Sequence, residues 1–319
     1  MSLNFKQKSG AARRIAMKNA DFYRAQKLRN KKNSRQNSYK NSPRKQSEDN
    51  LQNNKSLGQH WLRDREILDA IVFEAEITDG DFVLEIGPGL GTLTSSILRA
   101  VATSGQVLAI EFDPKLAQNL PKSFPGKNLE VLNADFLDFD LDKLPSGYKV
   151  AANVPYYITS KIVEKLLTAH NKPSVAALLV QKEVAERMAA QSGNLSVLGV
   201  ATQIYAETEL GSLVPREFFT PPPKVDSQVI ILKIRQQNLL ERFNRETPSQ
   251  ISEEEFFRVV KAGFSSKRKK IAKSLSANFA IPREKVEEIL ERAEISPDLR
   301  AQDLSIQDWL TLAKIWQEK

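Results

Sequence analysis

The segment Glu85–Gly91, of sequence EIGPGLG, constrains the fold of this chain more than any other. It begins within the short apolar run Phe82–Ile86, and the residues after it, Thr92–Val101, have the apolar spacing of a helix. Glycines between a strand and a helix let a ligand approach the backbone, because a side chain would fill that space. The segment therefore predicts a ligand site at the carboxyl end of a strand.

Further strands are predicted between Ser56 and about Gln237. They are Gln106–Glu111, Leu129–Asn133, Lys149–Ala152, Ala176–Gln181 and Ser227–Ile234. Strands that alternate with helices are typical of an α/β fold, with a doubly wound, Rossmann-like sheet and ligands at the carboxyl ends of the strands.

The strand patterns end after Gln237. Apolar residues then recur at helical spacing in Phe256–Leu275, Val286–Ala293 and Trp309–Trp316, which predicts a small, all-helical C-terminal domain. We predict three parts: an N-terminal tail (1–55), a catalytic domain (56–239) and a helical domain (240–319).

The net charge of +8 is unevenly distributed. Residues 1–55 hold 15 Lys/Arg and three acidic residues, a net of +12, whereas the rest of the chain has a net of −4. The basic total indicates a polyanionic partner, but the folded body is not a uniformly basic nucleic-acid-binding surface.

The tail has two sections. Residues 11–28 have a loosely helical spacing of apolar residues among Arg and Lys, whereas 30–54 are almost entirely Asn, Ser, Gln, Lys and Arg. The second section cannot bury enough apolar surface to offset chain ordering, which predicts a solvated, disordered tail. Two alternatives are an RNA-binding arm that gains affinity from counterion release and an organelle transit peptide, although the tail is rich in Lys and Asn rather than Arg.

Composition excludes several classes of protein. The chain has no Cys and only His60 and His170, which argues against disulfides, thiol catalysis and a metal site. Its longest apolar runs are too short to span a bilayer, and its N-terminus lacks a signal-peptide pattern. We therefore expect a soluble cytoplasmic protein without membrane association or a metal.

The acidic residues around the glycine segment indicate its ligand. Glu85 would repel a pyrophosphate, and the segment departs from the Gly-x-Gly-x-x-Gly dinucleotide pattern. S-adenosylmethionine is a better candidate because it carries a sulfonium and an ammonium group. Glu111 ends the next strand, where a carboxylate can accept ribose hydroxyls, and Asp135 ends the third, where it can accept from an adenine amine.

The fourth strand leads into Asn153-Val-Pro-Tyr-Tyr157. One interpretation is a simple strand-end turn, because Asn tolerates unusual dihedrals and Pro stops strand pairing. The chemical interpretation is that an Asn oxygen and a backbone carbonyl accept the two N–H bonds of an adenine amine. Its conjugated lone pair then becomes available for attack on the sulfonium methyl, while Tyr156 stacks on the ring. We favour the chemical interpretation.

Four segments resemble the rRNA adenine-N6 dimethyltransferases of the KsgA and Erm type. They are Ser56–Leu62 (SLGQHWL), Glu85–Thr92, Asn153–Thr159 and Phe219–Ser227 (FTPPPKVDS). The resemblance covers residues 55 to about 312 and implies that S-adenosylmethionine is held by His60, Leu62, Gly87, Glu111, Asp135 and Asn153. It also implies that the catalytic residues are Asn153, Pro155, Tyr156 and Phe219, with Phe219 and Tyr156 on opposite faces of the flipped target base.

Within this family, Thr220–Ser227 and Gln181–Val184 are similar to the housekeeping enzymes of the small subunit. This implies dimethylation of two adjacent adenines in the 3′-terminal hairpin loop of 16S rRNA, within a partly assembled small subunit, by a monomer. The resistance methyltransferases of the large subunit are the runner-up.

The helical domain contains a basic cluster, defined here as Lys267, Arg268, Lys269, Lys270 and Lys273. A solvated helix face is one explanation of such a cluster. The resemblance favours contacts with RNA phosphates, which position a substrate without reading its sequence. The sequence departs from the family in part: it lacks the usual Asn/Gln before the Arg pair, and it has Gln302 where Glu is usual.

Other classes of function stay open. The chain can be a ribosome-assembly factor with methylation as a secondary activity, or an organelle homologue with a role in transcription. A DNA or small-molecule amine methyltransferase shares the chemistry of Asn153–Tyr156, but the GQHWL segment and the helical domain argue against it.

Overall fold

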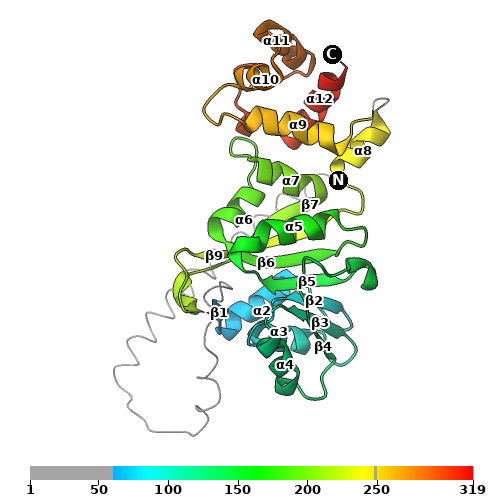
Figure 1. The fold of residues 1–319 in the computed structure, drawn as a ribbon, viewed down its shortest axis with the longest axis vertical. Helices are drawn as coiled ribbons and strands as arrows, with labels where there is room; N and C mark the ends of the chain where they lie inside the picture. Colours follow the sequence, from blue (N-terminus) through cyan, green and yellow to red (C-terminus); the bar gives the residue numbers. More distant parts are fainter. Residues whose placement is uncertain (1–59, 248–249, 319) are drawn as a thin grey trace, which may run out of the picture.

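The computed structural model describes residues 60–247 and 250–318 (Figure 1). The predicted tail lies outside these ranges. The catalytic part contains a seven-stranded sheet, and its order is β4 (Leu129–Asn133), β3 (Gln106–Glu111), β2 (Phe82–Ile86), β5 (Lys149–Asn153), β6 (Val175–Gln181), β9 (Ser227–Ile234) and β7 (Ala206–Val214). The first five strands run parallel, and β9 is antiparallel to both of its neighbours.

All six predicted strands are present, and the α/β fold is confirmed. Strand β7 was not predicted. It lies at the edge of the sheet and alternates buried residues with the exposed Glu207 and Glu209, and its register against β9 shifts between Leu210 and Leu213. A partly acidic edge strand with a bulge lacks the continuous apolar run of a central strand.

Helices cover both faces of the sheet. One face packs against α2 (Arg65–Glu74) and α3 (Thr92–Ala100), with α4 (Pro114–Ser123) beside β3 and β4; the other packs against α5 (Thr159–Thr168), α6 (Lys182–Met188) and α7 (Val197–Tyr205). Alternate residues of β6 belong to the two buried clusters, Ala176 and Leu178 to one and Ala177 and Leu179 to the other. This is the period-two pattern of a strand buried on both faces.

The C-terminal part is helical within its described residues, as predicted. It consists of α8 (Leu239–Glu246), α9 (Glu253–Phe264), α10 (Ile271–Phe279), α11 (Arg283–Arg292) and α12 (Ile306–Gln317). Helix α8 begins one residue before the predicted domain limit, with Asn238 as its N-cap. One buried cluster runs from the sheet through α7 to Phe256 and Trp309, so the two parts share a core.

Backbone hydrogen bonds also join the two parts. The N–H groups of Gly193 and Leu195 donate to the carbonyl of Gln302 at 2.9 and 3.2 Å. The side chain of Gln302 donates in return to the carbonyl of Gly193 at 2.9 Å. Gln302 stands where Glu is usual in the family. A glutamate carboxylate has no N–H to donate, so this hydrogen bond to Gly193 depends on the glutamine.

Two short strands connect the start of the described chain to the site. Strand β1 (Trp61–Leu62) pairs antiparallel with β8 (Phe219–Thr220), which places His60 beside the end of β5. Among the described residues, no helix is long and apolar enough to cross a membrane, and no group of His, Cys, Asp and Glu side chains could hold a metal ion.

Candidate active site

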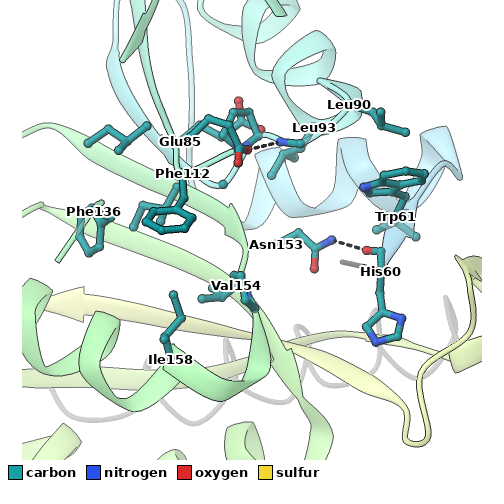
Figure 2. Close-up of a pocket in the computed structure, with 18 of the residues that line it drawn as sticks. His60, Trp61, Glu85, Leu90, Leu93, Phe112, Phe136, Asn153, Val154 and Ile158 are labelled. Atoms are coloured by element: carbon teal, nitrogen blue, oxygen red, sulfur yellow. Dashed lines mark hydrogen bonds between the residues drawn. The ribbon is translucent and has the colours of Figure 1, made fainter. Parts of the chain in front are cut away.

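A cavity of about 210 Å³ lies at the carboxyl ends of β2, β3 and β5, as expected for this type of sheet. Figure 2 shows side chains from different elements around it, among them Glu85, Asn153 and Trp61. Eight of the nine predicted catalytic and cofactor-binding residues line the cavity; Phe219 does not. The cavity therefore brings together residues that are up to about a hundred positions apart in the chain.

The glycine segment forms one wall. Gly87 has a φ of +67°, and a Cβ there would meet nothing within 4 Å. Gly91 has a φ of +78°, and its Cβ would lie 2.5 Å from Leu120. Only a residue without a side chain readily allows both the left-handed conformation and the close packing at Gly91. The segment thus has an open side at Gly87 and a tightly packed side at Gly91.

Glu111 is fixed at the end of β3 by backbone donors. Its carboxylate accepts from the N–H of Gly89 at 3.0 Å and from the N–H of Asp113 at 2.8 Å. Burial raises the pKa of Glu111, and these hydrogen bonds oppose the rise. The contact with Gly89 couples the carboxylate directly to the glycine segment.

Glu85 is the most unusual group in the cavity wall. It is 1% exposed, and the side chain and backbone N–H of Thr94 are the groups that approach its carboxyl oxygens. Burial, with a smaller contribution from nearby Glu111, raises the pKa of Glu85 to about 8. A group with this pKa is mostly protonated at pH 7, and a cationic group placed beside it would favour its ionised form.

Asp135 lies at the third strand end. Its Oδ1 accepts from the N–H of Leu137 at 2.8 Å, and the residue is half-buried at the cavity wall. Sequence reasoning did not identify the aromatic lining: Phe112 is 58% exposed, whereas Phe136 is buried. Phe112 and Phe136 directly follow Glu111 and Asp135 in the sequence, and this adjacency could have indicated that they line the same cavity.

Asn153 is oriented by the His60 main chain. Its Nδ2 donates to the carbonyl of His60 at 3.2 Å, and Figure 2 shows the amide oxygen directed away from that contact. Because the nitrogen is engaged, the oxygen is the amide atom available to accept a hydrogen bond from a ligand. Pro155, next to it in the lining, begins the turn that leads into Tyr156.

Tyr156 is held at both ends. Its hydroxyl lies 2.6 Å from Ser227 Oγ, and its ring stacks on the imidazole of His60 at 6.0 Å between centroids. The imidazole Nδ1 in turn donates to the carbonyl of Pro221 at 2.8 Å, since a carbonyl can only accept. Burial raises the pKa of the Tyr156 phenol. The ring is therefore a rigid, neutral surface.

Phe219 differs from the other predicted catalytic residues. It is 3% exposed, pairs with Leu62 across β8 and β1, and packs in the buried cluster behind the cavity. Leu62 is also buried but contributes to the cavity wall. A role of Phe219 at the target base stays a prediction.

The basic cluster lies in the helical domain and does not line the cavity. Its members are exposed in the turn between α9 and α10 and on the first turn of α10. Lys270 forms an ion pair with Asp298 at 2.6 Å. The cluster therefore offers solvent-exposed cations, one of them already engaged.

A Rossmann-like sheet, a glycine turn and strand-end carboxylates around one cavity define the class of S-adenosylmethionine-dependent methyltransferases. The model of the ribosomal RNA adenine dimethylase family matches residues 50–318, and the chain belongs to this family. Its methyl donor is S-adenosylmethionine. The buried carboxyl group of Glu85 fits that donor, because a cationic group beside it would stabilise its ionised form.

Relatives with assigned names agree with the family. The chain is 35% identical over 272 residues to ribosomal RNA small subunit methyltransferase A of Dehalococcoides mccartyi, covering 84% of this chain and 90% of the relative. It is 39% identical over 267 residues to the protein of the same name from Fusobacterium nucleatum, covering 82% and 97%.

Solved structures give the same result for the fold. The 23S rRNA methyltransferase ErmE is 32% identical with a TM-score of 0.64, covering 81% of this chain and 99% of that protein. A dimethyladenosine transferase from Plasmodium falciparum is 28% identical with a TM-score of 0.64, covering 79% and 96%. The predicted Rossmann-like methyltransferase fold with a helical C-terminal part is thus confirmed.

Proposed function

We propose that this chain dimethylates two adjacent adenines in the 3′-terminal hairpin loop of 16S rRNA. The observation that carries this proposal is the placement of Asn153, oriented by His60, on the same cavity as the buried carboxyl group of Glu85. The cavity thus combines Asn153, a hydrogen-bond acceptor for the adenine amine, with Glu85, an acidic group for the cationic cofactor. The names of the small-subunit relatives support this choice of rRNA.

The strand-end residues hold the cofactor in this proposal. Gly87 provides close backbone approach, the Glu111 carboxylate accepts the ribose hydroxyls, and Asp135 accepts from the adenine amine. His60 and Leu62 close the side formed by β1. When bound, S-adenosylmethionine supplies an electrophilic methyl group on its sulfonium.

Asn153 makes the target amine reactive. Its Oδ1 and a backbone carbonyl of the turn at Pro155 accept the two N–H bonds of the adenine amine. The nitrogen is thereby drawn toward tetrahedral geometry, and its lone pair leaves conjugation with the ring. The proton becomes acidic as the nitrogen is alkylated and passes to water, so the chain needs no general base.

The aromatic residues hold the base. Tyr156 presents the neutral ring fixed by Ser227, and Phe219 is proposed for the opposite face of the flipped base. Because Phe219 is buried in this structure, the second contact requires a movement of the β1–β8 pair. Stacking on aromatic rings offsets part of the cost of extruding a base, about a few kcal/mol.

The basic cluster supplies the RNA contacts outside the cavity. The predicted catalytic domain, residues 56–239, has a net charge of −5, so attraction to rRNA must come from local patches and from the ends of the chain. Exposed Lys and Arg side chains at Lys267–Lys270 are suited to phosphates of A-form RNA. We further propose that a monomer acts in the cytoplasm on an immature small subunit.

The test is methyl transfer in vitro to undermethylated small and large ribosomal subunits, with the methylated adenines mapped by mass spectrometry. The proposal predicts four methyl groups on two adjacent adenines of the small-subunit RNA and none on the large. Methylation of the large subunit instead would identify an activity on 23S rRNA, as the name of the 23S rRNA methyltransferase ErmE states for that protein, and would overturn the proposal.

A further inference from the structure

A second depression in the surface, the acidic groove, lies where the catalytic and helical parts meet. Its volume is about 520 Å³, and it is formed by α5, α7 and α9. It is separate from the cavity lined by Glu85 and Asn153, the methyl-transfer cavity. Apolar side chains form its floor, among them Val163, Leu167, Leu198, Ala201 and Phe257. These helices pack around a core shared by the two parts, so the groove belongs to a fixed junction.

Acidic side chains surround this floor. Glu164 on α5 and both Glu253 and Glu254 on α9 line the groove and are exposed, and Lys261 is the one basic residue among the described residues of its lining. The surplus of negative charge disfavours an RNA backbone at this site. An occupant should instead combine apolar side chains with positive charge.

Tyr205 also lines the groove and is 5% exposed. Burial, together with the side chain of Glu253 beside its hydroxyl, raises the pKa of the Tyr205 phenol. The phenol therefore stays protonated and lies next to an acidic side chain of the groove.

We propose that the acidic groove binds residues 11–28 of this same chain. The segment lies outside the described residues, and its sequence has the required chemistry. Its apolar residues are Ala12, Ile15, Ala16, Phe22 and Ala25, with Ile15 and Phe22 seven positions apart, as in peptides that insert one face into an apolar groove. Its charged residues are Arg13, Arg14, Lys18, Arg24, Lys27 and Asp21, a net of +4.

The connection is long enough for this contact. Residues 29–59 separate the segment from His60, where the described chain begins, and they can extend to about 100 Å. Attachment through such a connection gives an effective concentration on the order of 1 mM or below, so a weak intrinsic affinity suffices for occupancy. The contact is independent of the proposed rRNA substrate.

The absence of Cys from the sequence allows a direct test in the full-length protein. One variant carries Asn19→Cys in the segment and Thr168→Cys at the groove, where Thr168 is exposed on α5. A short bismaleimide should cross-link these two cysteines within one chain. The rate should be at least about tenfold higher than for a segment that is attached by the chain but not bound in the groove.

Two control variants, each with a different pair of introduced cysteines, test whether binding in the groove causes the fast cross-link. Asn37→Cys with Thr168→Cys uses a position closer to the attachment point, and Asn19→Cys with Gln118→Cys uses an exposed site on α4. Binding predicts slow reaction of both control pairs, and loss of the fast reaction when Ile15→Asp and Phe22→Asp are added. Equal rates for all pairs, no effect of the two Asp substitutions, or cross-links only between two chains would overturn the proposal.

Discussion

The methyl-transfer cavity and the basic cluster carry opposite charge and differ in exposure. The cavity has carboxylates at three neighbouring strand ends, with Glu85 fully buried and Glu111 largely so. The basic cluster has five cations exposed on a turn and a helix. Each sign suits the ligand proposed for it: a small cationic cofactor in the cavity and a polyanion at the basic cluster.

Burial is the more instructive difference. In a buried site a charge interacts strongly with one partner, whereas exposed charges are screened by salt and act collectively. Single substitutions should therefore have large effects in the cavity and small effects in the basic cluster.

The largest effect is expected for Asn153→Ala. Loss of the acceptor for the target amine should lower kcat for methyl transfer at least about 100-fold, the range seen when one preorganised hydrogen-bonding group is removed. Asn153→Asp keeps an acceptor but loses the N–H donated to His60, so its kcat should be intermediate. Cofactor affinity, measured by calorimetry, should change much less than kcat. Retained turnover in Asn153→Ala would exclude the activation of the amine by this residue.

A smaller effect is expected for Glu85→Gln. The neutral amide keeps the shape of the side chain but removes the buried anion, so affinity for S-adenosylmethionine at pH 9 should fall by about 2 kcal/mol, or about 30-fold. Glu130→Gln, an exposed position on β4, is the control. Calorimetric titration measures both. Equal affinities for all three proteins would show that Glu85 does not interact with the cofactor.

The pKa of Glu85 also predicts a pH dependence. In the folded protein without cofactor it is about 8, against an ordinary value of 4.5, so the folded chain binds the extra proton between these values. The contribution of this group to the free energy of unfolding therefore falls as pH rises from about 4.5 to about 8. Glu85→Gln should raise Tm more at pH 8 than at pH 5 in thermal melts without cofactor. An identical shift at both pH values would contradict the raised pKa.

A moderate, salt-dependent effect is expected when Lys267, Arg268 and Lys269 are all replaced by Ala. Affinity for small-subunit rRNA at low salt should fall about tenfold, and the slope of log K against log salt should decrease by about three. Replacing Lys115, Lys122 and Lys127, at the other edge of the molecule near α4, is the matched control. Filter binding at several salt concentrations measures both. An unchanged slope would remove the basic cluster from the RNA contacts.

The smallest effect is expected for Gln302→Glu. The substitution removes one donated hydrogen bond between the two parts of the chain, worth about 1 kcal/mol. KM for the small subunit should rise a few-fold while kcat stays the same, because only the placement of the basic cluster changes. Lower pH should partly restore KM, since a protonated Glu can donate. A changed kcat with an unchanged KM would contradict this role.

Much of the fold could be predicted because central strands are continuous apolar runs. Phe82–Ile86 and Gln106–Glu111 have the predicted limits, and Lys149–Asn153 is one residue longer than predicted. The edge strand Leu129–Asn133 also has its predicted limits, although Glu130 and Asn133 are exposed. The edge strand Ala206–Val214 was missed because its exposed acidic residues and bulge give no such run.

The strand-end acids of the cavity were also predictable, since carboxyl ends of parallel strands meet at one edge. Contacts that depend on distant segments were not. The His60–Pro221 hydrogen bond joins residues 161 positions apart, and the burial of Phe219 and the donation by Gln302 likewise depend on tertiary packing. No local pattern encodes such contacts.

The division of roles between the cavity and the basic cluster can be tested in one measurement. Steady-state kcat and KM would be determined on undermethylated small subunits, at one salt concentration, for Asn153→Ala and for the triple Ala variant at Lys267, Arg268 and Lys269. We predict that Asn153→Ala lowers kcat at least about 100-fold, whereas the triple variant raises KM and leaves kcat unchanged. A triple variant that loses kcat as severely as Asn153→Ala, or an Asn153→Ala that changes KM alone, would contradict this division.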